Sequence, residues 1–190
     1  AAEFGGIDIL VNNASAIYLA GTLQTPPKRL DLMFQVNMRG TFLASQACLP
    51  YLLQGDNPHI LNLSPPLDLS PRWFKDHTAY TISKYGMSLC VLGMAAEFQG
   101  KVAVNALWPK TVIQTAALAM LGGLVPPEAC RTPEIVADAA HAVLCRPSSA
   151  CSGRFLIDEE VLREEGVSEF ERYAVSPGHP LHTDLFLAPD

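Results

Sequence analysis

Four short apolar runs, separated by long segments of helical periodicity, constrain the fold more than any other feature of this sequence. The runs cover residues 6–13, 59–64, 102–108 and 153–158. Their length and their content of Val, Ile and Leu favour strands, and an almost continuous apolar character is typical of a parallel sheet buried on both faces. Helical patterns cover residues 28–53, 78–99 and 132–145, with a loop and short helix over 110–123. This alternation predicts an α/β domain with a parallel sheet.

Polar side chains gather where the predicted strands end. Asn12, Asn13 and Ser64 close the first two runs, and Pro109 stops the third. In open α/β sheets the ligand crevice lies outside the carboxyl ends of the strands. A buried amide there needs a hydrogen-bond partner from the backbone or from a ligand. The sequence therefore predicts a ligand site along this edge of the sheet.

Tyr80 and Lys84 lie at the start of the second long helix, on the same side of the sheet. Their separation of four places both on one helix face. A neighbouring ammonium lowers the pKa of a phenol, which gives a proton donor and acceptor usable near neutral pH. Such a pair also occurs on solvated helix faces, but the expected crevice favours chemistry. Asn37 interrupts the apolar stripe of the first helix, either for this chemistry or for a structural hydrogen bond.

Charge and composition exclude several classes of function. The 190 residues suffice for one domain with its own core, and the formal net charge is −6. Without a Lys/Arg cluster, this charge argues against nucleic acid or an anionic membrane as a partner. No apolar run reaches the roughly 18–20 residues of a membrane span. The first six residues have neither the basic region nor the apolar core of a signal peptide.

The five cysteines and five histidines are dispersed and show no metal-ligand spacing. This pattern predicts reduced thiols in an intracellular protein and no metal site. We expect a cytoplasmic location, with a mitochondrial or peroxisomal one as the alternative in a eukaryote.

The motifs at these positions resemble those of the short-chain dehydrogenase/reductase family. Residues 12–15 (Asn-Asn-Ala-Ser) resemble its Asn-Asn-Ala-Gly motif, 37–40 its helical Asn-x-x-Gly, and 80–84 its Tyr-x-x-x-Lys. Residues 61–64 resemble the strand that delivers the catalytic serine, and residues 109–111 occupy the family's Pro-Gly position. The resemblance implies a Rossmann-like parallel sheet flanked by helices.

The resemblance also implies four catalytic residues, which are Tyr80, Lys84, Asn37 and Ser64. Tyr80 would exchange a proton with the substrate oxygen while hydride passes to or from a nicotinamide ring. Lys84 would lower the pKa of Tyr80 and bind the nicotinamide ribose, and Asn37 would hold a water for a proton relay. Ser64 would hydrogen-bond the reacting oxygen.

The cofactor implied is NADP or NAD. The residues expected around it are Asn12 and Ala14 on the adenosine half, Lys84 at the ribose, and Pro109, Thr111, Ile113 and Thr115 near the nicotinamide and phosphates. The substrate would be an alcohol or ketone of a lipophilic small molecule, such as a steroid or fatty-acyl compound, and the apolar segment 116–125 would be its lid. A homodimer or homotetramer is expected through the two long helices.

Three features depart from the family pattern. Ser64 is followed by Pro65 and stands sixteen residues before Tyr80, where about thirteen is usual, so either the loop is longer or the site works without this serine. Lys110 replaces the usual glycine and either pairs with a phosphate or faces solvent. The N-terminal strand and glycine-rich turn, expected before Gly5, are missing, and four of seven strands are present.

We therefore expect a single domain over residues 1–190 that is N-terminally incomplete, with residues 159–190 as a C-terminal extension packed on it. The alternative to an active oxidoreductase is a silent, truncated relative that binds lipid or partner subunits through its helix faces.

Overall fold

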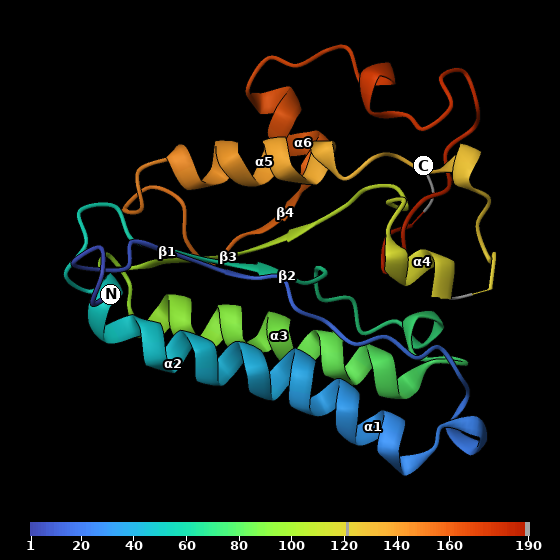
Figure 1. Cartoon of the computed structure of the whole chain (residues 1–190), viewed down its shortest axis with the longest axis horizontal. Helices are drawn as coiled ribbons and strands as arrows, with labels where there is room; N and C mark the ends of the chain where they lie inside the picture. The colour runs from blue at the N-terminus through green and yellow to red at the C-terminus, as the bar shows by residue number, and fades with distance from the viewer. Residues whose placement is uncertain (121, 189–190) are drawn as a thin grey trace.

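A computed structural model describes residues 1–120 and 122–188. Its helices pack on a parallel sheet (Figure 1). The strands are β1 (Ile9–Asn12), β2 (His59–Leu63), β3 (Ala103–Trp108) and β4 (Phe155–Ile157), and they lie side by side in chain order. Asn12 pairs with Asn62, and Trp108 with Ile157, so the carboxyl ends of neighbouring strands are aligned. The predicted α/β fold with a parallel sheet is confirmed.

Helices cover both faces of the sheet (Figure 1). On one face lie α1 (Pro27–Met33), α2 (Gly40–Leu52) and α3 (Thr78–Glu97), and on the other lie α5 (Glu134–Cys145) and α6 (Asp158–Glu164). The short α4 (Ala116–Met120) stands beyond the carboxyl ends of the strands, near the C-terminal tail. Short 3-10 turns fill the connections at Thr22–Gln24, Pro71–Trp73, Pro127–Ala129 and Glu171–Tyr173.

The predicted helix over 28–53 is continuous, but its middle is a π-helical segment, η2 (Phe34–Arg39). The backbone N–H of Gly40 donates to the carbonyl of Gln35, five residues earlier, as a π-helix requires. The wider turn contains Asn37, which is fully buried. Pro50 lies in the last turn of α2, and the helix ends at Leu52, which agrees with a proline near its end.

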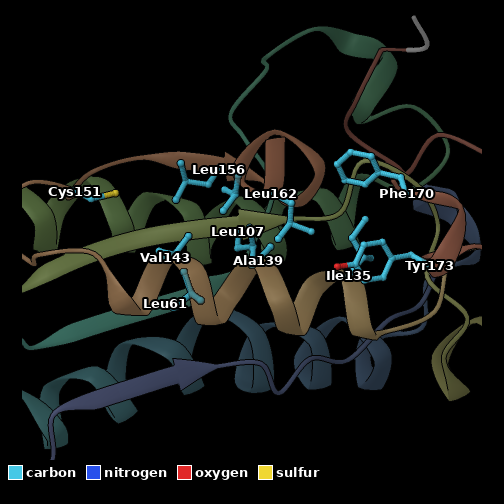
Figure 2. Close-up of a cluster of buried hydrophobic side chains, with 11 residues drawn as sticks. Leu61, Leu107, Ile135, Ala139, Val143, Cys151, Leu156, Leu162, Phe170 and Tyr173 are labelled. Carbon is cyan, nitrogen blue, oxygen red and sulfur yellow. The ribbon is translucent and has the colours of Figure 1, made fainter. Parts of the chain in front are cut away.

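The core beneath α5 consists of apolar side chains from the sheet, α5, α6 and the segment after α6 (Figure 2). Leu61 and Leu107 reach it from β2 and β3, and Ile135, Ala139 and Val143 reach it from α5 at spacings of four. That spacing forms one stripe along a helix. The stripe fixes α5 against the sheet, so the start of α5 lies near the strand ends.

A second cluster of buried side chains lies between α2, α3 and the opposite face of the sheet, including Leu52, Ile60, Val91 and Val104. The strands are therefore buried on both faces in the middle of the sheet, as their continuous apolar sequence predicts. Across the described residues no helix is long and apolar enough to cross a membrane.

Candidate active site

Tyr80 forms part of the wall between two adjoining pockets. The first, of about 800 Å³, lies towards α4 and the C-terminal tail, and the second, of about 440 Å³, lies over the ends of β1 to β3 and the start of α5. Tyr80 sits in the first turn of α3, where the helix begins at Thr78 after the loop that contains Trp73. Trp108, the last residue of β3, also lines both pockets.

Lys84 lines the smaller pocket one turn further along α3. Its Nζ donates to the carbonyl of Leu63 at 2.7 Å and to Ser15 Oγ at 3.5 Å, and lies 5.0 Å from the centre of the Trp108 ring. The ammonium therefore rests on the ends of β1, β2 and β3 together. The predicted convergence of these strand ends on the Tyr80–Lys84 pair is present in the structure.

Asn37 braces the loop after β1 against α3. Its Oδ1 accepts from the backbone N–H of Ala16 at 2.7 Å and from Ser15 Oγ at 3.2 Å, while its Nδ2 donates to the carbonyl of Ala16 and to Ser83 Oγ, each at 2.9 Å. These four bonds use the whole capacity of the amide. The side chain of Asn37 is linked to Lys84 through Ser15, and its expected role in holding a relay water stays a prediction.

The pKa of Tyr80 moves in the direction opposite to the prediction from its spacing to Lys84. Burial raises the pKa of the Tyr80 phenol above its usual value, and the nearby carboxylate of Asp184 raises it further. The buried Lys84 ammonium, which donates to Leu63 and Ser15, does not reverse this upward shift. In this structure the pKa of Tyr80 is thus raised and not lowered, and the stabilisation of its phenolate by Lys84 stays a prediction.

Two further groups beside Tyr80 titrate near neutrality. Burial lowers the pKa of Lys84 to about 7, with the charge of Asp184 opposing the shift. Burial also raises the pKa of Asp184 to about 7, against the opposing hydrogen bond from the Leu185 amide. A buried charge in low dielectric is disfavoured unless it is well compensated, which explains both directions.

Ser64 is fully buried at the end of β2, and its Oγ has no hydrogen-bond partner within the described part of the chain. It lines neither pocket, whereas its neighbour Leu63 lines the smaller one. Its predicted catalytic role stays a prediction.

The residues predicted to bind a cofactor divide into two groups. Lys84, Pro109, Ile113 and Thr115 line the smaller pocket, together with Asn13 and Ser15. Asn12, Ala14 and Thr111 are outside it. Asn12 instead donates to Ser45 Oγ at 3.1 Å and to Asn62 Oδ1 at 2.8 Å, which ties β1 to β2 and α2.

Thr111 is buried, and its backbone pairs with that of Thr183 in the C-terminal tail. The predicted substrate lid over 116–125 contributes Ala117, Leu118, Leu124 and Val125 to the larger pocket. Residue 121 of that segment lies outside the described residues.

Comparison with known proteins assigns the family. The family model for the short chain dehydrogenases matches residues 1–121, more than half of the chain. The chain belongs to this family. It is 65% identical over 185 residues to hydroxysteroid dehydrogenase-like protein 2 of Danio rerio, a match that covers 97% of this chain and 44% of the relative. The chain thus spans less than half the length of the curated relatives it matches.

Solved structures show the same fold. A crystal structure of a putative dehydrogenase from Xanthomonas campestris is 60% identical, with a TM-score of 0.95 over 99% of this chain and 69% of that one. An angucycline C-6 ketoreductase with bound NADP shares the fold at 22% identity, with a TM-score of 0.66 over 80% of this chain and 61% of that one.

Sequence reasoning missed the contribution of the C-terminal tail to the site of this short-chain dehydrogenase. Asp184, Leu185 and Leu187 line the larger pocket, and Phe186 stacks on Tyr80 with ring centres 6.1 Å apart. No motif marks these residues in the sequence. The position of Trp108 immediately before Pro109, at a predicted strand end, was a signal that could have been used.

Proposed function

We propose that this chain forms the catalytic part of a nicotinamide-dependent oxidoreductase that interconverts an alcohol and a ketone on a lipophilic small molecule. The observation that carries this proposal is the position of Tyr80 between two pockets, beside Lys84. A group that exchanges a proton with a reacting oxygen must lie within hydrogen-bonding reach of it, and here a cofactor and a substrate could each contact the same phenol.

The smaller pocket suits one half of a dinucleotide. Its lining combines an apolar surface from Pro109, Ile113 and Val136 with polar groups from Asn13, Ser15 and Lys84. An ammonium and small polar side chains match ribose hydroxyls, and the apolar walls match a flat ring. We propose NADP or NAD as the cofactor, with family membership as the further support.

The larger pocket suits an apolar substrate of moderate size. Its walls are mostly aliphatic and aromatic, and its volume of about 800 Å³ lies within the usual range for ligand sites. A steroid or a fatty-acyl compound has this character, and the apolar side chains of segment 116–125 would cover it.

In the proposed reaction the cofactor, when bound, supplies or accepts the hydride. Tyr80 donates its proton to the oxygen of a ketone, or accepts the proton of an alcohol, in a site from which apolar walls exclude water. Lys84 orients the cofactor ribose and supplies positive charge when the phenolate forms. The raised pKa of Tyr80 favours the protonated state, which is the form that reduces a ketone.

Tyr80→Phe tests the proposal. Removing the hydroxyl should lower kcat at least about a hundredfold, since a general acid contributes roughly 10²–10⁴, while the Kd for NADPH or NADH changes less than about threefold. Turnover of a panel of ketones and fluorescence titration of the nicotinamide, with the protein at its natural length, provide the two readouts.

Tyr85→Phe is the matched control. Tyr85 is buried on the same helix, but its hydroxyl donates to the carbonyl of Asp68 and lies outside both pockets. Its loss should leave kcat within about threefold, as expected for a hydroxyl remote from the chemistry. Full turnover by Tyr80→Phe would contradict the proposed function, and so would the absence of nicotinamide binding by the unmodified protein.

We also propose a homodimer or homotetramer, supported by exposed apolar side chains on α2 and α3. A cytoplasmic location is proposed as well, and it is supported only by the dispersed cysteines of the sequence.

A further inference from the structure

The C-terminal tail is fastened along the larger pocket on both sides of Asp184. Backbone bonds join Val112 N–H to the carbonyl of His182, His182 N–H to Ala129, and Asp184 N–H to Lys110, at 2.9, 2.9 and 3.0 Å, and Trp108 Nε1 donates to Leu185 at 2.9 Å. Phe186 is buried among the rings of Trp73, Tyr80, Tyr85 and Trp108. These contacts hold the Asp184 side chain in a defined position.

Asp184 places a carboxyl group in a pocket that is otherwise largely apolar. Among the described residues of the lining, only Tyr80, His182 and Asp184 carry a titratable group. One carboxyl oxygen, Oδ1, accepts the N–H of Leu185 at 2.6 Å, and within the described residues the side chain has no other hydrogen-bond donor. The side chain is partly buried and faces the pocket, so its remaining acceptor capacity is available to a hydrogen-bond donor on a bound molecule.

We propose that Asp184 determines substrate specificity by accepting a hydrogen bond from a hydroxyl group next to the reacting carbonyl. The preferred substrate class is an uncharged α-hydroxyketone, or the corresponding vicinal diol, on an apolar body. A substrate with a carboxylate at that position is rejected by Asp184. This inference rests on the proposed function, because it takes the larger pocket as the substrate site.

Tyr80 and Asp184 line the same pocket, and Phe186, two residues after Asp184, stacks on Tyr80, so one molecule bound in this pocket can contact both groups. Burial raises the pKa of Asp184 to about 7, so at higher pH the carboxylate is available to accept a hydrogen bond and to repel an anion. Discrimination by a buried charge of this kind combines an attractive and a repulsive element.

Binding of three matched probes tests the inference. Acetophenone, 2-hydroxyacetophenone and phenylglyoxylate share one aromatic ketone and differ by a hydrogen-bond donor or a carboxylate. Their Kd values are measured by ligand-observed NMR at about pH 8, on the protein at its natural length, where Asp184 is ionised. The unmodified protein should bind 2-hydroxyacetophenone at least about tenfold more tightly than acetophenone, as expected for a hydrogen bond to a charged group.

Two substitutions separate the hydroxyl and carboxylate effects. Asp184→Ala should reduce the preference for 2-hydroxyacetophenone to within about twofold, since the acceptor is lost. Asp184→Asn keeps an oxygen for the N–H of Leu185, so the tail retains its turn, and it should strengthen binding of phenylglyoxylate about tenfold because the repelling charge is gone. Asp56→Asn, an exposed position with the same charge change, should alter none of the ratios.

The inference is overturned if the unmodified protein does not prefer the hydroxyketone, or if Asp184→Asn leaves phenylglyoxylate binding unchanged. If Asp184→Ala does not fold, the binding of phenylglyoxylate by Asp184→Asn alone tests the inference. Because the readout is binding, it does not depend on turnover: probe ratios that shift as expected, with no ketone reduced by the unmodified protein, would contradict the proposed function and leave the role of Asp184 intact.

Discussion

At the scale of single residues, the site contains an acid and a base that burial shifts in opposite directions. The pKa of Asp184 rises from 3.8 to about 7, so between these values the folded state holds more protons than the unfolded one. Stability then falls as the pH rises through this range, because the ionised carboxylate is better solvated in the unfolded chain than in the folded protein. A functional group that costs stability is common in active sites.

Asp184→Asn should therefore gain stability relative to the unmodified protein as the pH rises from about 5 to about 8. Urea unfolding at both pH values measures the difference in free energy of unfolding between the two proteins. If that difference were the same at both pH values, folding would not raise the pKa of Asp184. Asp56→Asn provides the control, since an exposed carboxyl should show no such trend.

Asn37→Ala should lower the free energy of unfolding by roughly 2–4 kcal/mol, because four hydrogen bonds are lost and partly buried backbone groups of Ala16 are left unpaired. Urea unfolding at neutral pH measures it. Gln35→Ala removes an exposed amide from the same π-helical segment and should stay within about 0.5 kcal/mol. Equal effects of the two substitutions would contradict the bracing role of Asn37.

The sequence predicts those site residues that lie close together along the chain. It misses those that only the tertiary fold brings to the site. Tyr80 and Lys84 are one helical turn apart, so local geometry alone places them together. Asp184 reaches the same pocket from the far end of the chain, through backbone bonds to Lys110 and Val112 that no local pattern encodes. The direction of the Tyr80 pKa shift was missed for the same reason, since it depends on burial and on Asp184.

At the scale of elements, the packing of η2 on α3 depends on a glycine. A Cβ at Gly86 of α3 would lie 2.6 Å from Met38 Cγ and 2.8 Å from Met38 Cβ, far inside normal contact. The close approach allows Asn37, the neighbour of Met38, to reach Ser83 on α3. The π-helical widening itself leaves no trace in the apolar periodicity, which explains why only an ordinary helix was predicted there.

Gly86→Ala should destabilise the protein by roughly 1–3 kcal/mol through overpacking, despite the better helix propensity of alanine. In a Met38→Ala background the same substitution should cost less, because the clashing side chain is gone. Urea unfolding of the four proteins in this double-mutant cycle gives the coupling. A cost of Gly86→Ala that did not depend on Met38 would show that the two helices approach each other differently.

At the scale of the whole molecule, α2 and α3 present an apolar outer surface. Its exposed side chains include Phe42, Leu43, Leu89 and Leu92. Scattered apolar residues are common on protein surfaces, but a group on two adjacent helices is typical of a subunit interface. This surface supports the proposed homo-oligomer.

Leu89→Arg should shift the protein from an oligomer to a monomer at micromolar concentration, because a charge would be buried without a partner in the interface. Sedimentation velocity measures the change. Leu69→Arg, in the loop before α3, replaces a leucine that is 78% exposed and should leave the oligomer intact. A purely monomeric unmodified protein would contradict the proposed assembly.

The four strands and three long helices were predicted close to their observed bounds, because periodicity and strand-ending polar residues mark them in the sequence. The course of residues 174–187 was not predicted beyond their packing on the domain. This segment has little regular structure, and it is held by scattered bonds to Lys110, Val112, Ala129 and Cys130. Such long-range pairing cannot be read from a local pattern.

Phe186 packs between the rings of Trp73, Tyr80 and Trp108. This packing has a consequence for the order in which the larger pocket forms during protein synthesis. Residues 181–187 leave the ribosome after every helix and strand of the fold described above. A nascent chain that has emerged only to the end of β4 possesses all four strands and both members of the Tyr80–Lys84 pair, but it lacks one wall of the larger pocket. Because domains begin to fold as they emerge, the sheet can assemble before residues 181–187 complete the larger pocket, so this pocket forms later in synthesis than the fold around it.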